Sequence, residues 1–361
     1  MIEWYSGCFE RARLVARQPH ESKLVIPGGR TMLTRNDLAK QPEMVFTKDL
    51  PWFPAVVAHC GALWRGFTHA KTHKEVLRFL LRFPPIAEFV FSDRSFSFKY
   101  LTQNYLVRGF TVRQRAACFL YHYNRLHEAL PDSLLRRTFQ EDIPILEIPE
   151  GANRFVLTLG LSRPSYKEGE LSLHLRVDGN IVFVLSFTIV PGWVVNSQAS
   201  EILLITRLQG VKGAYSHISD ATKTLHDVAP DALLFAALQG VANAFGIVEI
   251  VAVSATRQSY YSRRAAAVFE EAYDDFFIGL GILKDAAGFF RISLPYQEKP
   301  LTCIKHGHKL RTKEKRAFKQ QIQSACEGFF VKNAPDATRG LFIELPKGLA
   351  PFINPMPASR P

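Results

Sequence analysis

The stretch "LSLHLRVDGNIVFVLSFTIV", residues 171–190, decides the fold. Its first half alternates apolar and polar residues with the period of two that is typical of a β-strand. Asp178 and Gly179 then interrupt the pattern, and this pair suits the positive φ angles of a type I′ turn. The chain returns through an apolar, β-branched run at residues 181–190, so the whole stretch predicts an antiparallel hairpin.

Apolar runs on both sides extend the hairpin into a sheet. "RFVLTLG" at residues 154–160 and "EILLITRL" at residues 201–208 read as strands. Together with the two strands of the hairpin they predict four antiparallel strands in sequence order.

The pattern changes after the fourth strand. We expect a helix over about 216–228 and a second helix from Pro230 to a stop at Gly246. The segments that follow are a buried strand at 247–255, a helix striped by Ala265, Phe269, Ala272 and Phe276, and a last strand at 288–295. This order predicts an α/β (α+β) fold, with a mainly antiparallel sheet that turns parallel where a helix crosses over.

Three regions are predicted along the chain. Residues 1–145 form a mostly helical N-terminal region, residues 150–295 form the α/β core, and residues 296–361 form a basic extension with a proline-rich tail. The clearest N-terminal helix covers about 112–130, with a capping-box pattern at Thr111 and Gln114. Its basic residues are expected on a solvated polar face: Arg113, Arg115, His122, Arg125 and His127. In the extension, Thr312 is expected to cap a helix striped by Phe318, Ile322 and Ala325.

Composition narrows the class of partner. The chain has 45 basic and 33 acidic residues, hence a formal net charge of +12, which favours phosphate-bearing ligands, acidic lipid or nucleic acid. Its five cysteines are widely spaced, so they suit a reducing cytosol better than a disulfide framework. The longest apolar run, residues 181–190, is about half as long as a bilayer span. We expect a cytoplasmic protein, with peripheral association at the inner membrane as an alternative.

The segment "ITRLQGVKGAYSHISDATK", residues 205–223, is the strongest candidate for a ligand site. A strand runs through Gly210, Lys212 and Gly213 into a helix, and a helix N-terminus offers unpaired amides and a positive dipole end to an anion. Ser216 or Ser219 is expected to cap this helix. Two readings stay open: a phosphate cradle, or a tight turn that needs glycine and leaves Lys212 in solvent.

The central blocks resemble the VirK/YbjX family of Gram-negative bacterial proteins. The similar blocks, within about residues 100–325, are "SLHLRV…VFVLSFTIVPG", "LLITRLQGVKG", "ATKTLHDVAPDALLFAALQGVANAFGI", "AVSATRQ", "AYDDFF" and "SLPYQEKPL…GHKLRTKEKRAFKQQI". The resemblance implies a role in virulence, cell-envelope integrity and the surface presentation of outer-membrane proteins. It transfers no catalytic residue.

The order of strand, glycine loop, helix, strand, helix and strand also looks like the second half of a GNAT-type acyltransferase. Such enzymes hold the pyrophosphate of acyl-CoA on a loop whose pattern here gives Arg207, Gln209, Gly210, Lys212, Gly213 and Ala214. Gly213 comes one place late, and two helices rather than one separate the strands, so the match is imperfect. In these enzymes a tyrosine protonates the departing thiolate, and Tyr273 is the matching residue. The alternative for Tyr273 is a half-buried structural tyrosine.

Two further groups of residues complete the candidate sites. Arg257 and Gln258 follow the strand at 247–255, and the loop at the carboxyl end of such a strand often contacts substrate. The C-terminal extension offers a cationic surface to anionic lipid: Lys305, Lys309, Arg311, Lys315 and Arg316. Nucleic acid is the less favoured partner, because no aromatic residues interleave with these cations. Cys303, His306 and His308 lack a second ligand pair, so no metal site is predicted.

Two functions from different classes therefore remain. The first is an acyltransferase that uses acyl-CoA or another phosphate-bearing donor on an envelope or peptide substrate. The second is a non-catalytic factor that binds the membrane surface and supports envelope biogenesis. The sequence does not indicate the oligomeric state.

Overall fold

The computed structural model describes residues 68–163 and 167–334. All of them belong to one compact unit, Val45–Pro361. The proline-rich tail and the first part of the helical N-terminal region lie outside these residues. The predicted boundaries at about 145 and 296 stay predictions.

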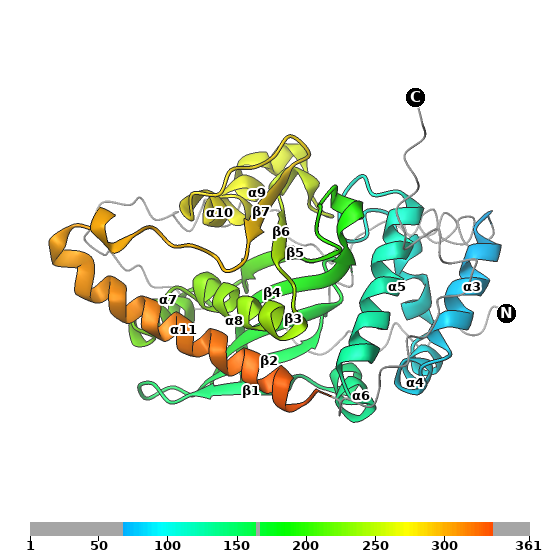
Figure 1. Ribbon diagram of the computed structural model, residues 1–361, viewed down its shortest axis with the longest axis horizontal. Helices are drawn as coiled ribbons and strands as arrows, with labels where there is room; N and C mark the ends of the chain where they lie inside the picture. The colour runs from blue at the N-terminus through cyan, green and yellow to red at the C-terminus, as the bar shows by residue number, and fades with distance from the viewer. Residues whose placement is uncertain (1–67, 164–166, 335–361) are drawn as a thin grey trace. The chain divides into compact units, whose positions relative to one another are not determined.

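A seven-stranded sheet organises the described chain (Figure 1). Its strands lie in sequence order: β1 (Ile143–Ile148), β2 (Phe155–Leu161), β3 (Leu171–Val177), β4 (Asn180–Pro191), β5 (Glu201–Gly210), β6 (Glu249–Val253) and β7 (Phe289–Ser293). Every neighbouring pair is antiparallel except β5 and β6, which are parallel. The mixed α/β fold with a mainly antiparallel sheet is thus confirmed, and β1 is an additional strand that we did not predict.

The predicted hairpin joins β3 and β4. Asp178 has φ 49° and Gly179 has φ 84°, the two positive angles that a type I′ turn requires. Leu173 lies opposite Leu185, so the leucine side of each strand faces the same way. This register gives the sheet one strongly apolar face.

Helix α8 (Pro230–Phe245) covers the apolar face, packing on β3, β4 and β5. As predicted, α8 begins with a proline and ends at Gly246, whose φ is 68°. Helix α11 (Lys309–Lys332) packs along α8 and reaches β1 (Figure 1). Its buried stripe is Phe318, Ile322, Cys326 and Phe330, while Ala325 is only half-buried. Thr312 does not cap α11, because the helix already begins at Lys309 and the Thr312 hydroxyl donates to the His308 carbonyl at 2.8 Å.

The helices that precede the sheet are α3 (Ala70–Leu80), α4 (Pro84–Ser92), the 3₁₀ segment η2 (Arg94–Leu101), α5 (Val112–Ala129) and α6 (Asp132–Gln140). Helix α5 packs on β4 and begins with the predicted Thr111–Gln114 capping box. The expectation that all its basic residues are solvated was wrong for Arg115 and His122, which are buried. His122 Nδ1 accepts a hydrogen bond from the Ile189 amide of β4 at 3.1 Å, so this histidine joins helix to sheet.

Three shorter helices complete the connections: α7 (Tyr215–Thr224), α9 (Ala266–Tyr273) and α10 (Asp275–Gly279). The single helix expected through Phe276 is therefore two helices that break at Asp274. Among the described residues, none of the helices combines the length and apolarity of a membrane-spanning segment.

Candidate functional site

One face of the sheet carries polar and small side chains where the other carries leucine. Residues opposite one another on neighbouring strands point to the same side of a sheet. Two rows cross β2, β3, β4 and β5 in this way: Thr158, His174, Val184 and Gln209, and next to them Gly160, Ser172, Ser186 and Arg207. We call these two rows the polar face. Their side chains are largely buried, which is unusual for such a polar set.

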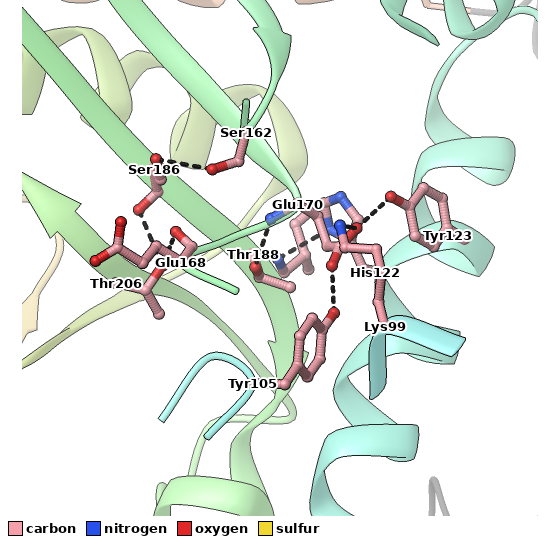
Figure 2. Close-up of polar contacts among 11 residues, drawn as sticks. Lys99, Tyr105, His122, Tyr123, Ser162, Glu168, Glu170, Ser186, Thr188 and Thr206 are labelled. Atoms are coloured by element: carbon pink, nitrogen blue, oxygen red, sulfur yellow. Dashed lines mark hydrogen bonds and ion pairs between the residues drawn. The ribbon is translucent and has the colours of Figure 1, made fainter. Parts of the chain in front are cut away.

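The turn Glu168–Gly169–Glu170 lies against this face (Figure 2). Gly169 has φ 134°, and a Cβ there would stand 2.9 Å from the Cβ of Ser186. Only glycine therefore fits this approach. The Thr206 hydroxyl donates to the Glu168 carbonyl at 2.6 Å, which fixes the turn beside β5.

Glu170 forms one side of the turn and is fully buried. Lys99 Nζ lies 2.7 Å from its carboxylate, and the hydroxyls of Tyr105 and Tyr123 both donate to it (Figure 2). Burial lowers the pKa of Lys99 and raises that of Tyr105. Three donors satisfy one buried carboxylate, so this cluster joins η2 and α5 to the sheet.

Glu168 forms the other side of the turn and meets the predicted tyrosine. The Gln209 amide satisfies both neighbours when its oxygen accepts from Arg207 at 2.8 and 2.9 Å and its nitrogen donates to the Tyr273 hydroxyl at 2.8 Å. Tyr273 in turn hydrogen-bonds the Glu168 carboxylate, and Arg207 Nε lies 3.8 Å from the same group. Burial, and next the Glu168 charge, raise the pKa of Tyr273, so its hydroxyl stays protonated.

The same tyrosine stands where two parallel strands separate. β5 and β6 pair only through Leu203–Ile250, Leu204–Val251 and Ile205–Ala252. Residues 206–210 of β5 run on with β4 on one side and without a described strand on the other. Asp274 Oδ1 accepts from the Ala255 amide at 2.6 Å, which ties the end of α9 to the end of β6. The end of α9 is therefore fixed beside the point where the two strands separate.

The predicted phosphate loop lies at the end of β5. Gly210 is the last residue of β5, and a Cβ there would meet Ile218 Cδ1 at 2.8 Å, so packing of α7 explains this glycine. Gly213 has φ 86° with open space around it, and Lys212 is exposed. Capping by Ser216 or Ser219 was wrong, because Ala214 occupies the N-cap position and no side chain caps α7.

The predicted loop residues thus fall into two groups. Gly210, Lys212, Gly213 and Ala214 form the turn into α7, whereas Arg207 and Gln209 point from β5 into the polar face. The second group therefore positions Tyr273 rather than the turn.

Arg257 and Gln258 lie in the loop after β6, as predicted: Arg257 ends the 3₁₀ turn η4 (Ala255–Arg257) and Gln258 follows it. Arg257 is held by backbone carbonyls: its Nε donates to Ala287 at 2.8 Å and its Nη1 to Arg108 at 3.2 Å. Gln258 is buried, and its Oε1 has no partner among the described residues. Of the two, Gln258 is the one that carries a buried acceptor without a described partner.

The basic surface is less free than its sequence implies. Arg311 pairs with Asp227, and Arg316 with Glu298 at 2.6 Å. Lys305 is exposed, while Lys309 and Lys315 are half-buried. Within residues 68–163 and 167–334 no three metal-ligating side chains gather, and Cys303, His306 and His308 are exposed.

Sequence reasoning missed Glu168, Glu170 and His174. The alternation in "LSLHLRV" places Ser172, His174 and Arg176 on the side opposite to the leucines. That pattern was a signal for a polar face. A polar side of a strand is normally solvated, however, so the pattern did not indicate burial.

The sheet, its one parallel pair and the buried polar face define a mixed α/β protein with a candidate ligand site at the carboxyl ends of β5 and β6. A family model described as a protein of unknown function, DUF535, matches residues 62–326, and the chain belongs to this family. Neither a curated protein nor a solved structure matches the chain.

Proposed function

We propose that this protein is an acyltransferase that uses acyl-CoA or another phosphate-bearing thioester as its donor. The observation that carries the proposal is the separation of β5 from β6 after Ile205, beside Tyr273 and before the turn at 210–214. In open α/β sheets, ligands bind at the carboxyl ends of strands where the connection changes sense. The unpaired edge of residues 206–210 offers backbone groups to an extended arm that itself carries amides.

The turn into α7 suits the phosphates of such a donor. The first helical amides are not capped by a side chain, and the helix dipole favours an anion there. Lys212 adds an exposed positive charge next to them. The phosphates would then lie at the end of β5 and the thioester further back, beside Gln209.

Tyr273 has a role that follows from its protonation. A cysteine-like thiol has a pKa of about 8.5, so its thiolate can depart near neutral pH without first being protonated. The raised pKa of Tyr273 keeps the hydroxyl as a donor. Its task is therefore to donate a hydrogen bond to the departing sulfur, which would replace the Glu168 carboxylate as its acceptor, rather than to give up its proton.

Calorimetric titration with CoA and acetyl-CoA tests the proposal. Lys212→Ala should weaken binding by about 1–3 kcal/mol, the scale of a charge-assisted hydrogen bond, or roughly 5- to 150-fold. Lys223→Ala, on the same helix α7 and exposed, is the matched control and should bind as wild type does. Absence of heat with CoA, acetyl-CoA and a long-chain acyl-CoA would remove the proposal.

The VirK/YbjX resemblance supports a narrower version, in which the acceptor belongs to the cell envelope or is a peptide. It equally supports the second candidate, a non-catalytic factor at an anionic membrane surface. One observation favours that candidate: Leu310 is 70% exposed between Lys309 and Arg311, in the first turn of α11. An apolar side chain flanked by cations is typical of a segment that lies on anionic lipid.

A further inference from the structure

His174 lies in the middle of the polar face with both ring nitrogens short of partners. Its side chain is only 3% exposed. Nδ1 lies 3.3 Å from Asp142 Oδ2, an ion-pair contact without good hydrogen-bond alignment, and Nε2 has no partner among the described residues. Thr158, directly opposite on β2, likewise has a buried hydroxyl without a described partner. Buried polar atoms of this kind are costly unless something satisfies them.

Asp142 is held beside the His174 ring by its ion pair with Arg176. It comes from the link between α6 and β1, and its carboxylate lies over Gly160, where a Cβ would stand 1.9 Å from Oδ1. His174, and then Arg176, lower the pKa of Asp142 to about 2. The ionised carboxylate favours the tautomer with the proton on Nδ1, which leaves the lone pair on Nε2.

His174 lies on the same face of the sheet as Gln209 and Tyr273, the residues proposed to contact the acyl donor. His174, Val184 and Gln209 occupy one row across three neighbouring strands. Strands lie about 4.8 Å apart, so the Cα atoms of His174 and Gln209 are roughly 10 Å apart. Gln209 bonds the Tyr273 hydroxyl. The imidazole and the tyrosine therefore stand on either side of Val184.

A cavity of about 420 Å³ lies beside this row on the polar face. Its lining residues are Asp142, Pro144, Arg154, Val156, Thr158, Arg176 and Gly179. His174 is not one of them, but two lining residues adjoin it: Asp142 at 3.3 Å and Thr158 on the neighbouring strand. The volume is within the usual range for a small-molecule site, about 300–1,000 Å³. Arg154 is 67% exposed and already pairs with Glu147, and Arg176 pairs with Asp142, so the walls are polar but nearly charge-balanced. Such walls suit a hydrophilic molecule rather than a fatty chain.

We infer that His174 is the general base for the acyl acceptor, a small hydrophilic amine or alcohol that enters through this cavity; the inference depends on the proposed acyltransferase function. The nucleophile forms a bond to the thioester carbonyl carbon, and the carbon–sulfur bond breaks. The proton of the nucleophile moves to His174 Nε2, while the thiolate leaves with a hydrogen bond from Tyr273. The imidazolium then returns its proton to water. Asp142 is the positioning residue, and Arg176 pairs with the same carboxylate.

The full chain can be tested with acetyl-CoA as donor and ethanolamine, which carries an amine and a hydroxyl, as acceptor. We expect ethanolamine to accelerate thiol release in wild type, with a rate that rises with pH. His174→Gln should slow release by at least about 100-fold, the usual scale for loss of a general base. Its affinity for CoA should be unchanged. The exposed histidine His306 gives the control, since His306→Ala should behave as wild type.

A second readout does not need activity. Nitrogen NMR of the imidazole, assigned with His174→Gln, should find the proton of neutral His174 on Nδ1, and Asp142→Asn should shift that balance. A proton fixed on Nε2 would overturn the inference. If wild type binds CoA but releases no thiol, or if His174→Gln is as fast as wild type, the inference fails while the proposed donor site survives. If CoA does not bind at all, both fail.

Discussion

Gly240 of α8 lies against Gln323 of α11 so closely that a Cβ on Gly240 would stand 2.1 Å from the Gln323 carbonyl oxygen. The Gln323 oxygen belongs to the backbone of α11, and a Cβ on Gly240 would be fixed to the backbone of α8, so neither atom can move away by rotating a side chain. The contact explains why a glycine sits inside the long apolar helix α8. It also means that α11 is part of the packed protein at this point.

Gly240→Ala should therefore push the two helices apart. Overpacking of this kind costs about 1–3 kcal/mol of unfolding free energy, and here it outweighs the better helix propensity of alanine. Urea denaturation of the purified protein measures the loss. Gly328→Ala in α11 is the matched control, because nothing lies within 4 Å of a Cβ there. It should leave stability equal or higher, and a similar loss in both variants would contradict the explanation.

The sequence predicted those parts of the fold that local geometry determines. Asp178 and Gly179 form the expected turn because their positive φ angles depend only on the two residues themselves. The Thr111–Gln114 box is equally local. The β5–β6 crossover was also predictable, because helices must intervene between parallel strands.

The buried polar groups were not predictable in the same way. Lys99 and Glu170 are 71 residues apart in sequence, so their pairing exists only in the folded chain. A glutamate beside glycine normally indicates a solvated turn. The candidate loop shows the same difficulty, since the pattern assigned Arg207 to a ligand loop, whereas its guanidinium is held on the polar face by Gln209.

Glu170→Gln should destabilise the protein strongly. It removes the charge that compensates Lys99 in a buried cluster, and breaking such a pair costs about 3–5 kcal/mol. Chemical denaturation should give a lower midpoint with an unchanged slope. Glu88→Gln breaks an exposed pair with Arg136 and serves as control, with little expected effect. A second variant, Lys99→Met with Glu170→Leu, should recover part of the loss: no unpaired charge remains, but the hydroxyls of Tyr105 and Tyr123 lose their shared acceptor.

His122 makes stability depend on pH in a defined direction. Burial, and next the charge of Lys99, lower the pKa of His122 to about 3 in the folded protein. The unfolded chain takes up a proton near pH 6.5, so it binds more protons than the folded chain between these values. Stability is thus complete above about pH 6.5 and falls by about 1.4 kcal/mol for each unit below it.

His122→Asn isolates this effect, because an amide oxygen can still accept from the Ile189 amide but does not titrate. The difference in unfolding free energy between wild type and variant should shrink steadily from pH 6.5 to pH 4. Parallel pH curves for the two proteins would show that His122 is not held neutral by burial.

The membrane candidate depends on those cations in and just before α11 that remain outside the described ion pairs. Arg311 and Arg316 already bind Asp227 and Glu298, so reversing them would disturb the fold as well as the surface. Lys305 and Lys313 are exposed and form the cleaner test. Each cation near an anionic bilayer contributes about 1 kcal/mol, so Lys305→Glu with Lys313→Glu should reduce binding to phosphatidylserine-containing vesicles at least 30-fold.

Leu310→Ser should weaken binding further, since Leu310 is exposed beside these charges. Vesicle co-sedimentation at low and high salt measures the effect, which should fade as salt screens the charges. The melting temperature should not change in these variants. Wild-type binding that is absent, or that is equally strong at high salt, would leave the acyltransferase proposal without its rival.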